Sequence, residues 1–302
     1  MKVLVLSEHE VEELLPMKQC IAVMEDALAA LARGEVHNPL RQAIRAPGAP
    51  GLLGLMPAWR SGETPYYALK EVCVFPGNPK RGLDTHLGAV ILHSGDTGEP
   101  LAFMNAAAIT AIRTAAVSAV ATKLLAREDA AVLAIIGTGV QGRSHREAIP
   151  LVRPIREIRM CGRNDSIEET VKGADIVVTA TNSRDPILKK EWLSPGVHIN
   201  AVGSSIASAR ELDADLVVAA SLFVDRREST VNESGDYLAA VAHGATIRGE
   251  LGELLIGTAE GRKSVDEITL FKSLGLAVED LAAAAFLYEN ARQNGRGTWV
   301  DF

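Results

Sequence analysis

The feature that most constrains the fold is a glycine-rich turn near the middle of the chain. Residues 134–136 end an apolar run that is typical of a strand, and residues 137–142 read Gly-Thr-Gly-Val-Gln-Gly. A helix is expected to follow, beginning near Arg143 and reaching Leu151. Because the free N–H groups at the start of such a helix can bind a pyrophosphate, this strand, turn and helix predict a dinucleotide-binding α/β fold.

Each glycine of the turn has a distinct expected role. Gly137 permits a tight turn, Gly139 lets the backbone approach the pyrophosphate, and Gly142 lets the helix pack closely on the strand. The intervening residues belong to the same expected cofactor site: Thr138, Val140 and Gln141. The alternative is that the glycines only make a tight turn and bind nothing.

Length and composition argue against several classes of protein. The 302 residues are enough for two domains of ordinary size. The net charge is -7 and basic residues are not clustered, which argues against a nucleic-acid partner. The three cysteines have no disulfide or zinc spacing, so no metal is expected. No apolar run has the length of a signal peptide or a membrane span, so a cytoplasmic protein without a membrane partner is expected.

The first third of the chain predicts a small α+β domain. Residues 2–6 form a strand, and Ser7 begins a pair of amphipathic helices that ends at Gly34. Short apolar segments between turns predict further strands at residues 53–56, 66–74, 88–93 and 100–105.

An alanine-rich helix is expected from Ala106 to Ala126. It contains Arg113 among apolar residues. Arg113 is either an exposed helix charge or, given its apolar neighbours, a cleft residue that binds an anion.

The rest of the chain alternates strands and helices, which predicts a parallel, doubly wound sheet. The expected strands are residues 155–161, 176–181, 198–203, 216–220, 222–225 and 268–272. The expected helices are residues 165–172, 237–242 and 276–292. The predicted class is α/β: a Rossmann-type doubly wound parallel sheet plus an α+β domain.

One connection is too short for an ordinary dinucleotide fold. Only residues 162–174 lie between the second strand of the sheet and Asp175, where a helix and a further strand would normally be found. Either one βα unit is truncated here, or a segment is missing from the sequence.

Several segments together resemble the ornithine cyclodeaminase/μ-crystallin family. They are residues 55–58, 69–70, 85–86, 113–116, 137–141 and 271–280. The resemblance covers nearly the whole chain, and it rests chiefly on Arg-Thr-Ala-Ala and Phe-Lys-Ser-Leu-Gly. It implies an NAD(P)-dependent homodimer that acts on a small α-imino or α-amino acid. The implied domains are 1–116 with 277–302 for substrate and dimerisation, and 117–276 for the dinucleotide.

The resemblance also implies a substrate site. Arg41 and Arg113 would hold the substrate carboxylate, because a guanidinium group binds a carboxylate through two parallel hydrogen bonds. Met56 would line the pocket. Lys70 would exchange a proton with the imine nitrogen, and two neighbouring arginines would lower its pKa. Without the family pattern, a surface lysine at a strand end is the favoured interpretation of Lys70, and a core or turn histidine that of His86.

Two departures from the family pattern bear on the reaction. Ser205 stands where cyclodeaminases have a catalytic aspartate, which disfavours deamination, although Asp213 and Asp225 lie further along the chain. At the end of the second strand, Arg163 and Asn164 follow where an acid would bind the ribose, so NADPH is favoured, with NAD as the alternative. The remaining expected cofactor residues are Thr114, Thr179, Ala180, Thr181, Val202, Gly203, Ser204, Lys272, Ser273 and Gly275.

The expected activity is hydride transfer to the C=N bond of an α-imino acid such as Δ1-pyrroline-2-carboxylate or Δ1-piperideine-2-carboxylate. The alternatives are an ornithine cyclodeaminase, an enzyme like alanine dehydrogenase, and a non-enzymatic NADPH-binding protein.

Overall fold

The computed structural model describes residues 1–302, which form two compact units. The first unit contains residues 1–113 and 276–302, and the second contains residues 114–275. Helix α3 (Ala106–Leu125) begins in the first unit and ends in the second. It is long and apolar enough to span a membrane, but 72% of its most apolar window is buried within the protein, as in a core helix.

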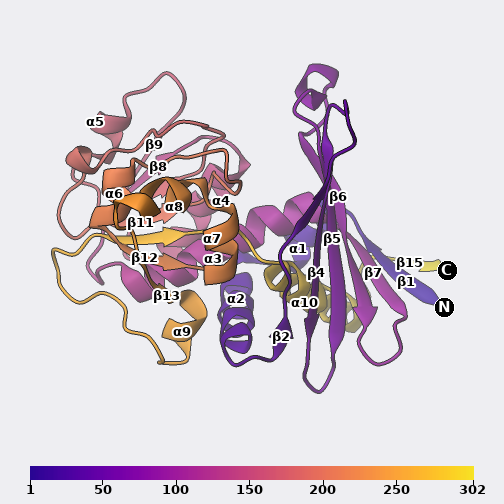
Figure 1. Cartoon of the computed structure of the whole chain (residues 1–302). Coiled ribbons are helices and arrows are strands. Elements are labelled where there is room, and N and C mark those ends of the chain that lie inside the picture. Colours follow the sequence, from indigo (N-terminus) through magenta and orange to yellow (C-terminus); the bar gives the residue numbers. More distant parts are fainter. The chain divides into compact units, whose positions relative to one another are not determined.

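The first unit is built on an eight-stranded, mostly antiparallel sheet (Figure 1). The order of its strands is β15 (Thr298–Asp301), β1 (Lys2–Leu6), β7 (Pro100–Asn105), β6 (His86–Ser94), β5 (Tyr66–Val74), β4 (Leu52–Arg60) and β2 (Val36–His37), with β3 (Gln42–Ile44) also paired to β4. The two chain ends meet at one edge, where β15 pairs with β1.

Three helices of the first unit, α1 (Glu8–Leu14), α2 (Met17–Ala32) and α10 (Ala277–Asn294), complete its core. Ser7 caps α1 through a capping box with Glu10, as expected of a serine at a helix start. Helix α10 packs against β4, β5, β6 and β7. Because side chains alternate along a strand, this face of β5 buries Tyr66, Ala68 and Lys70.

The second unit contains the predicted doubly wound parallel sheet. The order of its seven strands is β13 (Ile247–Glu250), β12 (Ser221–Val224), β14 (Thr269–Lys272), β11 (His198–Ala201), β10 (Ile176–Thr179), β8 (Val132–Ile136) and β9 (Glu157–Cys161). Its helices are α4 (Val140–Ala148), α5 (Ile167–Val171), α6 (Ala214–Ala219), α7 (Arg227–Glu233), α8 (Gly235–Ala240) and α9 (Leu251–Leu255). All strand pairs are parallel, which confirms the predicted fold class.

The short connection after β9 leaves that strand at the edge of the sheet. The chain passes from β9 through α5, a single short helix, directly to β10, which lies on the other side of β8. Arg159 of β9 donates hydrogen bonds to the carbonyl oxygens of Thr170 and Lys172, so the end of α5 is tied to the edge strand. The βα unit that an ordinary dinucleotide fold has here is therefore absent.

One predicted strand is wrong. Residues 216–220 fall largely in α6, which begins after Asp213, whose side chain accepts a hydrogen bond from the Asp215 N–H. A short apolar run fits a buried helix as well as a strand, and the capping aspartate decides between them. The expectations also lacked six short elements: β2, β3, β13, β15, α7 and α9.

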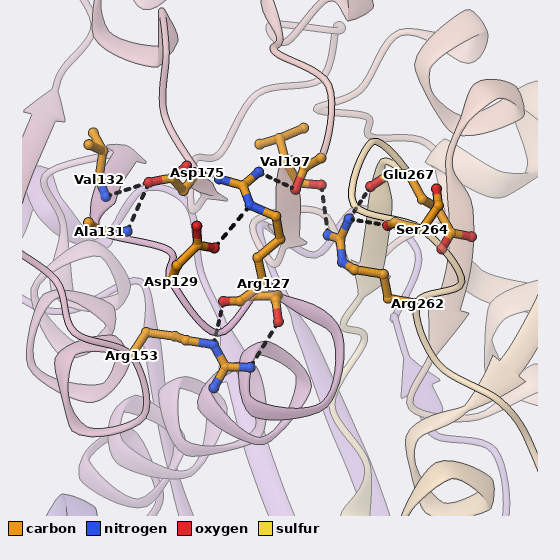
Figure 2. Close-up of polar contacts among 12 residues, drawn as sticks. Arg127, Asp129, Ala131, Val132, Arg153, Asp175, Val197, Arg262, Ser264 and Glu267 are labelled. Carbon is orange, nitrogen blue, oxygen red and sulfur yellow. Dashed lines mark hydrogen bonds and ion pairs between the residues drawn. The ribbon is translucent and has the colours of Figure 1, made fainter.

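An arginine network fixes the amino ends of the sheet in the second unit (Figure 2). Arg127 pairs with Asp175, which also accepts the N–H groups of residues 131 and 132 at the start of β8. Arg153 and Arg262 donate to carbonyl oxygens at the end of α3, where positive charge is favourable. This network stabilises the end of the sheet opposite to the glycine-rich turn.

Candidate active site

Lys70 lies at the centre of a buried charged cluster in the first unit. On strand β5, Lys70 is paired with Met56 of β4 and Val90 of β6, and it is only 5% exposed. Its side chain is on the face that α10 covers. Burying an ammonium group is unfavourable unless it is paired, so its partners decide its chemistry.

Two carboxylates at the start of α10 supply the pairing. Lys70 Nζ lies 3.1 Å and 3.3 Å from the two carboxylate oxygens of Asp280. Arg113 Nε donates to Asp280 Oδ1 at 3.1 Å, and its Nη1 donates to Glu279 Oε2 at 2.7 Å. All four side chains are buried, so the pairs are little screened by solvent.

The start of α10 is held in place from outside the helix. Asn38, which follows β2, accepts a hydrogen bond from the Val278 N–H at 2.8 Å through its side-chain oxygen. Glu279 and Asp280 lie in the first turn, where the helix dipole favours negative charge. The two carboxylates are therefore positioned by a fixed helix end.

The surroundings shift the pKa of Lys70 to about 8. Burial lowers it most; Asp280 raises it, while the charges of Arg113 and Arg41 lower it. Desolvation and then the charge of Lys70 lower the pKa of His86, at the start of β6. Lys70 is thus a lysine that can both hold and release a proton near neutral pH.

The structure brings most of the expected substrate residues together. Arg113 is buried, not an exposed helix charge, and Lys70 is not a surface lysine. Met56 is the direct neighbour of Lys70, and Arg41, half-buried between β2 and β3, is close enough to affect its pKa. The sequence reasoning gave no role to Glu279 and Asp280, although two adjacent acids at an otherwise apolar helix start were a signal.

The glycine-rich turn of the second unit has the geometry of a phosphate-binding turn. Gly137 has φ +120, and a Cβ there would lie 2.3 Å from the Ala180 carbonyl oxygen. A Cβ at Gly142 would lie 2.0 Å from the Gly137 carbonyl oxygen, so α4 packs directly on the turn. At Gly139, by contrast, a Cβ would meet nothing within 4 Å. The backbone is therefore open at the position where a pyrophosphate would approach, and the turn fits a dinucleotide.

The loops after β10 and β11 meet at the buried carboxylate of Glu211. Its oxygens accept hydrogen bonds from the Thr181 N–H at 2.7 Å, the Gly203 N–H at 2.7 Å and the Thr179 hydroxyl at 2.8 Å. Burial raises its pKa. Glu211 was not anticipated from the sequence, because two of its partners, Thr179 and Thr181, lie 32 and 30 residues before it.

Lys272 supports these loops through Asp236. It is buried and forms an ion pair with Asp236 at 3.0 Å, and Asp236 accepts the N–H groups of Glu211 and Leu212. Its ammonium group therefore braces the loop that carries Glu211. The neighbouring Ser273 donates its N–H to the Ala201 carbonyl oxygen.

The remaining expected cofactor residues are divided between surface and interior. Arg163 and Asn164 are exposed after β9, whereas Thr114 and Ser204 are buried. Ala180, Val202 and Gly275 occupy loop positions after β10, β11 and β14. The acid nearest the end of β9, Asp165, accepts the Gly162 N–H at 2.7 Å.

Both acids that could replace the expected aspartate at Ser205 accept hydrogen bonds from backbone N–H groups. Asp225 accepts the N–H groups of Leu274 and Gly275 at 2.7 Å and 2.8 Å. Asp213 caps α6. Both carboxylates therefore hold backbone structure in the second unit.

Comparison with known proteins gives a consistent result. The model of the ornithine cyclodeaminase/mu-crystallin family matches residues 1–167 and 164–295. Ketimine reductase mu-crystallin of Mus musculus is 39% identical over 94% of this chain and 96% of its own length. Δ1-Pyrroline-2-carboxylate reductase of Thermococcus litoralis, solved with NADH and L-proline, is 37% identical, with a TM-score of 0.91 over 98% of this chain and 99% of its own. An archaeal alanine dehydrogenase dimer with bound NAD is 34% identical, with a TM-score of 0.92 over all of both chains.

The family match also has a feature in the short connection after β9. It falls into two segments that overlap at residues 164–167, between β9 and the start of α5. The alignment with the mouse protein extends over 307 positions, more than the 302 residues of this chain, although it uses 94% of them. The relative therefore has residues with no counterpart here. With its charged cluster, its glycine-rich turn and matches over nearly its full length, the chain belongs to the ornithine cyclodeaminase/μ-crystallin family, as its motifs predicted.

Proposed function

We propose that the protein is an NAD(P)H-dependent reductase of α-imino acids of the Δ1-pyrroline-2-carboxylate or Δ1-piperideine-2-carboxylate type. The observation that carries the proposal is the buried Lys70 beside Arg113, with its pKa lowered to about 8. The relatives named above as ketimine reductase and Δ1-pyrroline-2-carboxylate reductase support the same reaction.

The substrate carboxylate binds to Arg113 and Arg41. A guanidinium group stays charged at any working pH and has five N–H donors, so Arg113 can bind a carboxylate while it keeps its bonds to Glu279 and Asp280. Arg41 adds a second positive charge from the segment between β2 and β3. Together they orient the α-carbon of the substrate.

Lys70 gives its proton to the imine nitrogen. The protonated form is present at neutral pH, because the pKa of about 8 lies above it, yet the proton is acidic enough to be shared with the imine. The iminium that results is a better hydride acceptor than the neutral imine. The nicotinamide supplies the hydride when the cofactor is bound.

The second unit binds the dinucleotide. Gly137, Gly139 and Gly142 would receive the pyrophosphate, and the loops fixed by Glu211 would border the rest of the cofactor. NADPH is favoured because Arg163 is exposed at the end of β9 while Asp165 is engaged with the Gly162 N–H. NAD remains the alternative, since the solved relatives bind NADH and NAD.

Ornithine cyclodeamination is the second candidate, and the side chain at residue 205 disfavours it. That reaction would need a carboxylate there, and the carboxylates of Asp213 and Asp225 hold backbone N–H groups instead. Incubation with ornithine and catalytic NAD, assayed for ammonia and proline, separates the two. An enzyme like alanine dehydrogenase would instead form alanine from pyruvate and ammonia, and a non-enzymatic binder would turn over none of these substrates.

A cytoplasmic homodimer is the proposed assembly. The face of the first sheet opposite to α10 is apolar, with Tyr67 51% exposed and Phe103 45% exposed. A bare apolar sheet face of this kind is typical of an interface. The dimer of the archaeal alanine dehydrogenase supports this arrangement.

The deciding experiment is a panel of cyclic imines and of α-keto acids with amines, scored by consumption of NADPH and of NADH. Lys70→Ala should reduce turnover of the best imine by about 100-fold or more, because general acid catalysis contributes that much. NADPH binding, measured by fluorescence, should be unchanged. Lys80→Ala, at an exposed turn, is the control. Full activity of Lys70→Ala would remove Lys70 from the mechanism.

A further inference from the structure

One carboxylate oxygen of Asp280 is shared between two cationic side chains. Asp280 Oδ1 lies 3.1 Å from Lys70 Nζ and 3.1 Å from Arg113 Nε. The three residues come from β5, α3 and α10, so the contact joins three elements. Asp280 is 1% exposed, and water cannot replace it as a partner for either cation.

We propose that Asp280 is the positioning residue of the reaction: it holds the ammonium group of Lys70 protonated and at a fixed distance from the carboxylate-binding Arg113. The inference rests on the proposed function, and it gives a role to a carboxylate of α10 that contacts both Lys70 and Arg113.

The geometry leaves Lys70 free to act on a substrate. An ammonium group has three N–H donors, and Asp280 is the only side chain to which Lys70 donates. At least one N–H therefore stays available for an imine nitrogen. Since the same oxygen also binds Arg113 Nε, the distance between the proton donor and the carboxylate anchor is set by a single carboxylate.

The charges around Lys70 show why a carboxylate is needed. Arg113 of α3 and Arg41 between β2 and β3 both disfavour its protonated form, as does burial, and His86 of β6 lies near it. Asp280 of α10 is the group that favours the protonated form of Lys70, while Glu279 accepts a hydrogen bond from Arg113. Removal of the Asp280 charge should therefore lower the pKa of Lys70 further, so that less of it is protonated near neutral pH.

The test is the pH dependence of imine reduction by the full-length Asp280→Asn variant. The protonated lysine is the active form, so the wild-type rate falls as the pH rises through the pKa of about 8. This fall in rate is the alkaline limb of the pH profile. In Asp280→Asn the limb should shift to lower pH by about one unit or more, as expected for the loss of an adjacent opposite charge. The rate at pH 8 should fall about fivefold or more and recover in part at lower pH.

Two variants control for structural damage. Glu289→Gln removes another carboxylate of α10, one that accepts a hydrogen bond from the Tyr66 hydroxyl at 3.0 Å and makes no contact with Lys70. The alkaline limb of the pH profile of this variant should match that of the wild type. Asp280→Glu keeps the charge but moves it, so the limb should stay near its wild-type position while kcat falls. A uniform loss of rate in Asp280→Asn, with an unmoved limb, would reduce Asp280 to a structural role and overturn the inference.

A second measurement does not depend on turnover. The rate at which an amine reagent labels Lys70, followed by mass spectrometry across pH, reports its protonation directly. The pH midpoint of labelling should lie near 8 in the wild type and lower in Asp280→Asn.

If Asp280→Asn does not fold, Asp280→Glu must keep the wild-type labelling midpoint, and a large fall of that midpoint would contradict the inference. If the wild type reduces no imine, the proposed function fails while the labelling result still decides the pairing.

Discussion

Arg113 and Lys70 are basic side chains whose charges are balanced inside the protein by Glu279 and Asp280. Such a cluster has little net charge until a substrate carboxylate arrives, and Arg41 then supplies the additional positive charge. A buried pair of this kind contributes specificity rather than stability, because the cost of desolvation offsets much of the attraction. Removal of a single member leaves an uncompensated buried charge, which is why conservative variants are the informative ones.

The choice between NADPH and NADH can be tested at Arg163. Arg163→Ser should weaken NADPH binding by about 10-fold to 100-fold, because a hydrogen-bonded charge pair with the 2′-phosphate contributes roughly 1.5–3 kcal/mol. NADH binding should hardly change. Fluorescence titration with both cofactors measures this, and Arg156→Ser, exposed before the opposite end of β9, is the control. Equal losses for both cofactors would argue against a 2′-phosphate contact.

Sequence reasoning predicted the individual residues of the site better than the contacts between them. Lys70 and Arg113 were identified through their motifs, and the structure shows why they matter: both contact Asp280. No local pattern relates residue 70 to residue 280, since that contact depends on how α10 packs on β5. Glu211 was missed for the same reason, because its donors lie on two separate loops.

At the scale of elements, the parallel sheet of the second unit was predictable because central strands such as β8 and β10 are nearly continuous apolar runs. The order of its strands was not, since β14 comes last in the chain and lies between β11 and β12. Helix α6 was misread because its apolar run is short. The loops at the carboxyl ends of the strands depend on Glu211 and Asp236 for their shape.

Glu211→Gln tests whether that carboxylate shapes the cofactor site. An amide cannot accept from both the Thr181 and Gly203 N–H groups with the same strength, so stability should fall by about 1–3 kcal/mol. NADPH affinity should fall about tenfold as the loops loosen. Glu267→Gln, in the network at the amino ends of the sheet, should lower stability without changing affinity. Denaturant unfolding and fluorescence titration separate the two effects.

At the scale of the whole molecule, the two units have different kinds of sheet. The first is a mostly antiparallel sheet whose helices lie on one face, which leaves the other face apolar and uncovered by its own chain. The second is a parallel sheet whose central strands are apolar and buried, as is usual when helices cover both faces. Only the first therefore has an exposed apolar sheet face, which is why the proposed dimer interface is placed there.

Phe103→Glu tests the proposed dimer. Phe103 lies on the uncovered face, in register with Ile91, and a charge there should oppose the burial of that face. Light scattering coupled to gel filtration should give a dimer for the wild type and a monomer for the variant. Val265→Glu, 70% exposed in the second unit, should remain dimeric. A wild-type monomer, or a variant that stays dimeric, would contradict the proposal.

Strand β9 lies at the edge of the second sheet, beside the short connection to α5. A strand at the edge of a sheet is hydrogen-bonded on one side only, so a further unit beyond β9 would leave the register of β8 with β10 unchanged. The charged side chains of Glu157 and Arg159 lie on this edge strand and discourage other strands from pairing with it. The connection at residues 162–166 is therefore a permissive position for engineering, where a helix and strand can be grafted back, or a reporter domain inserted, without rebuilding the sheet.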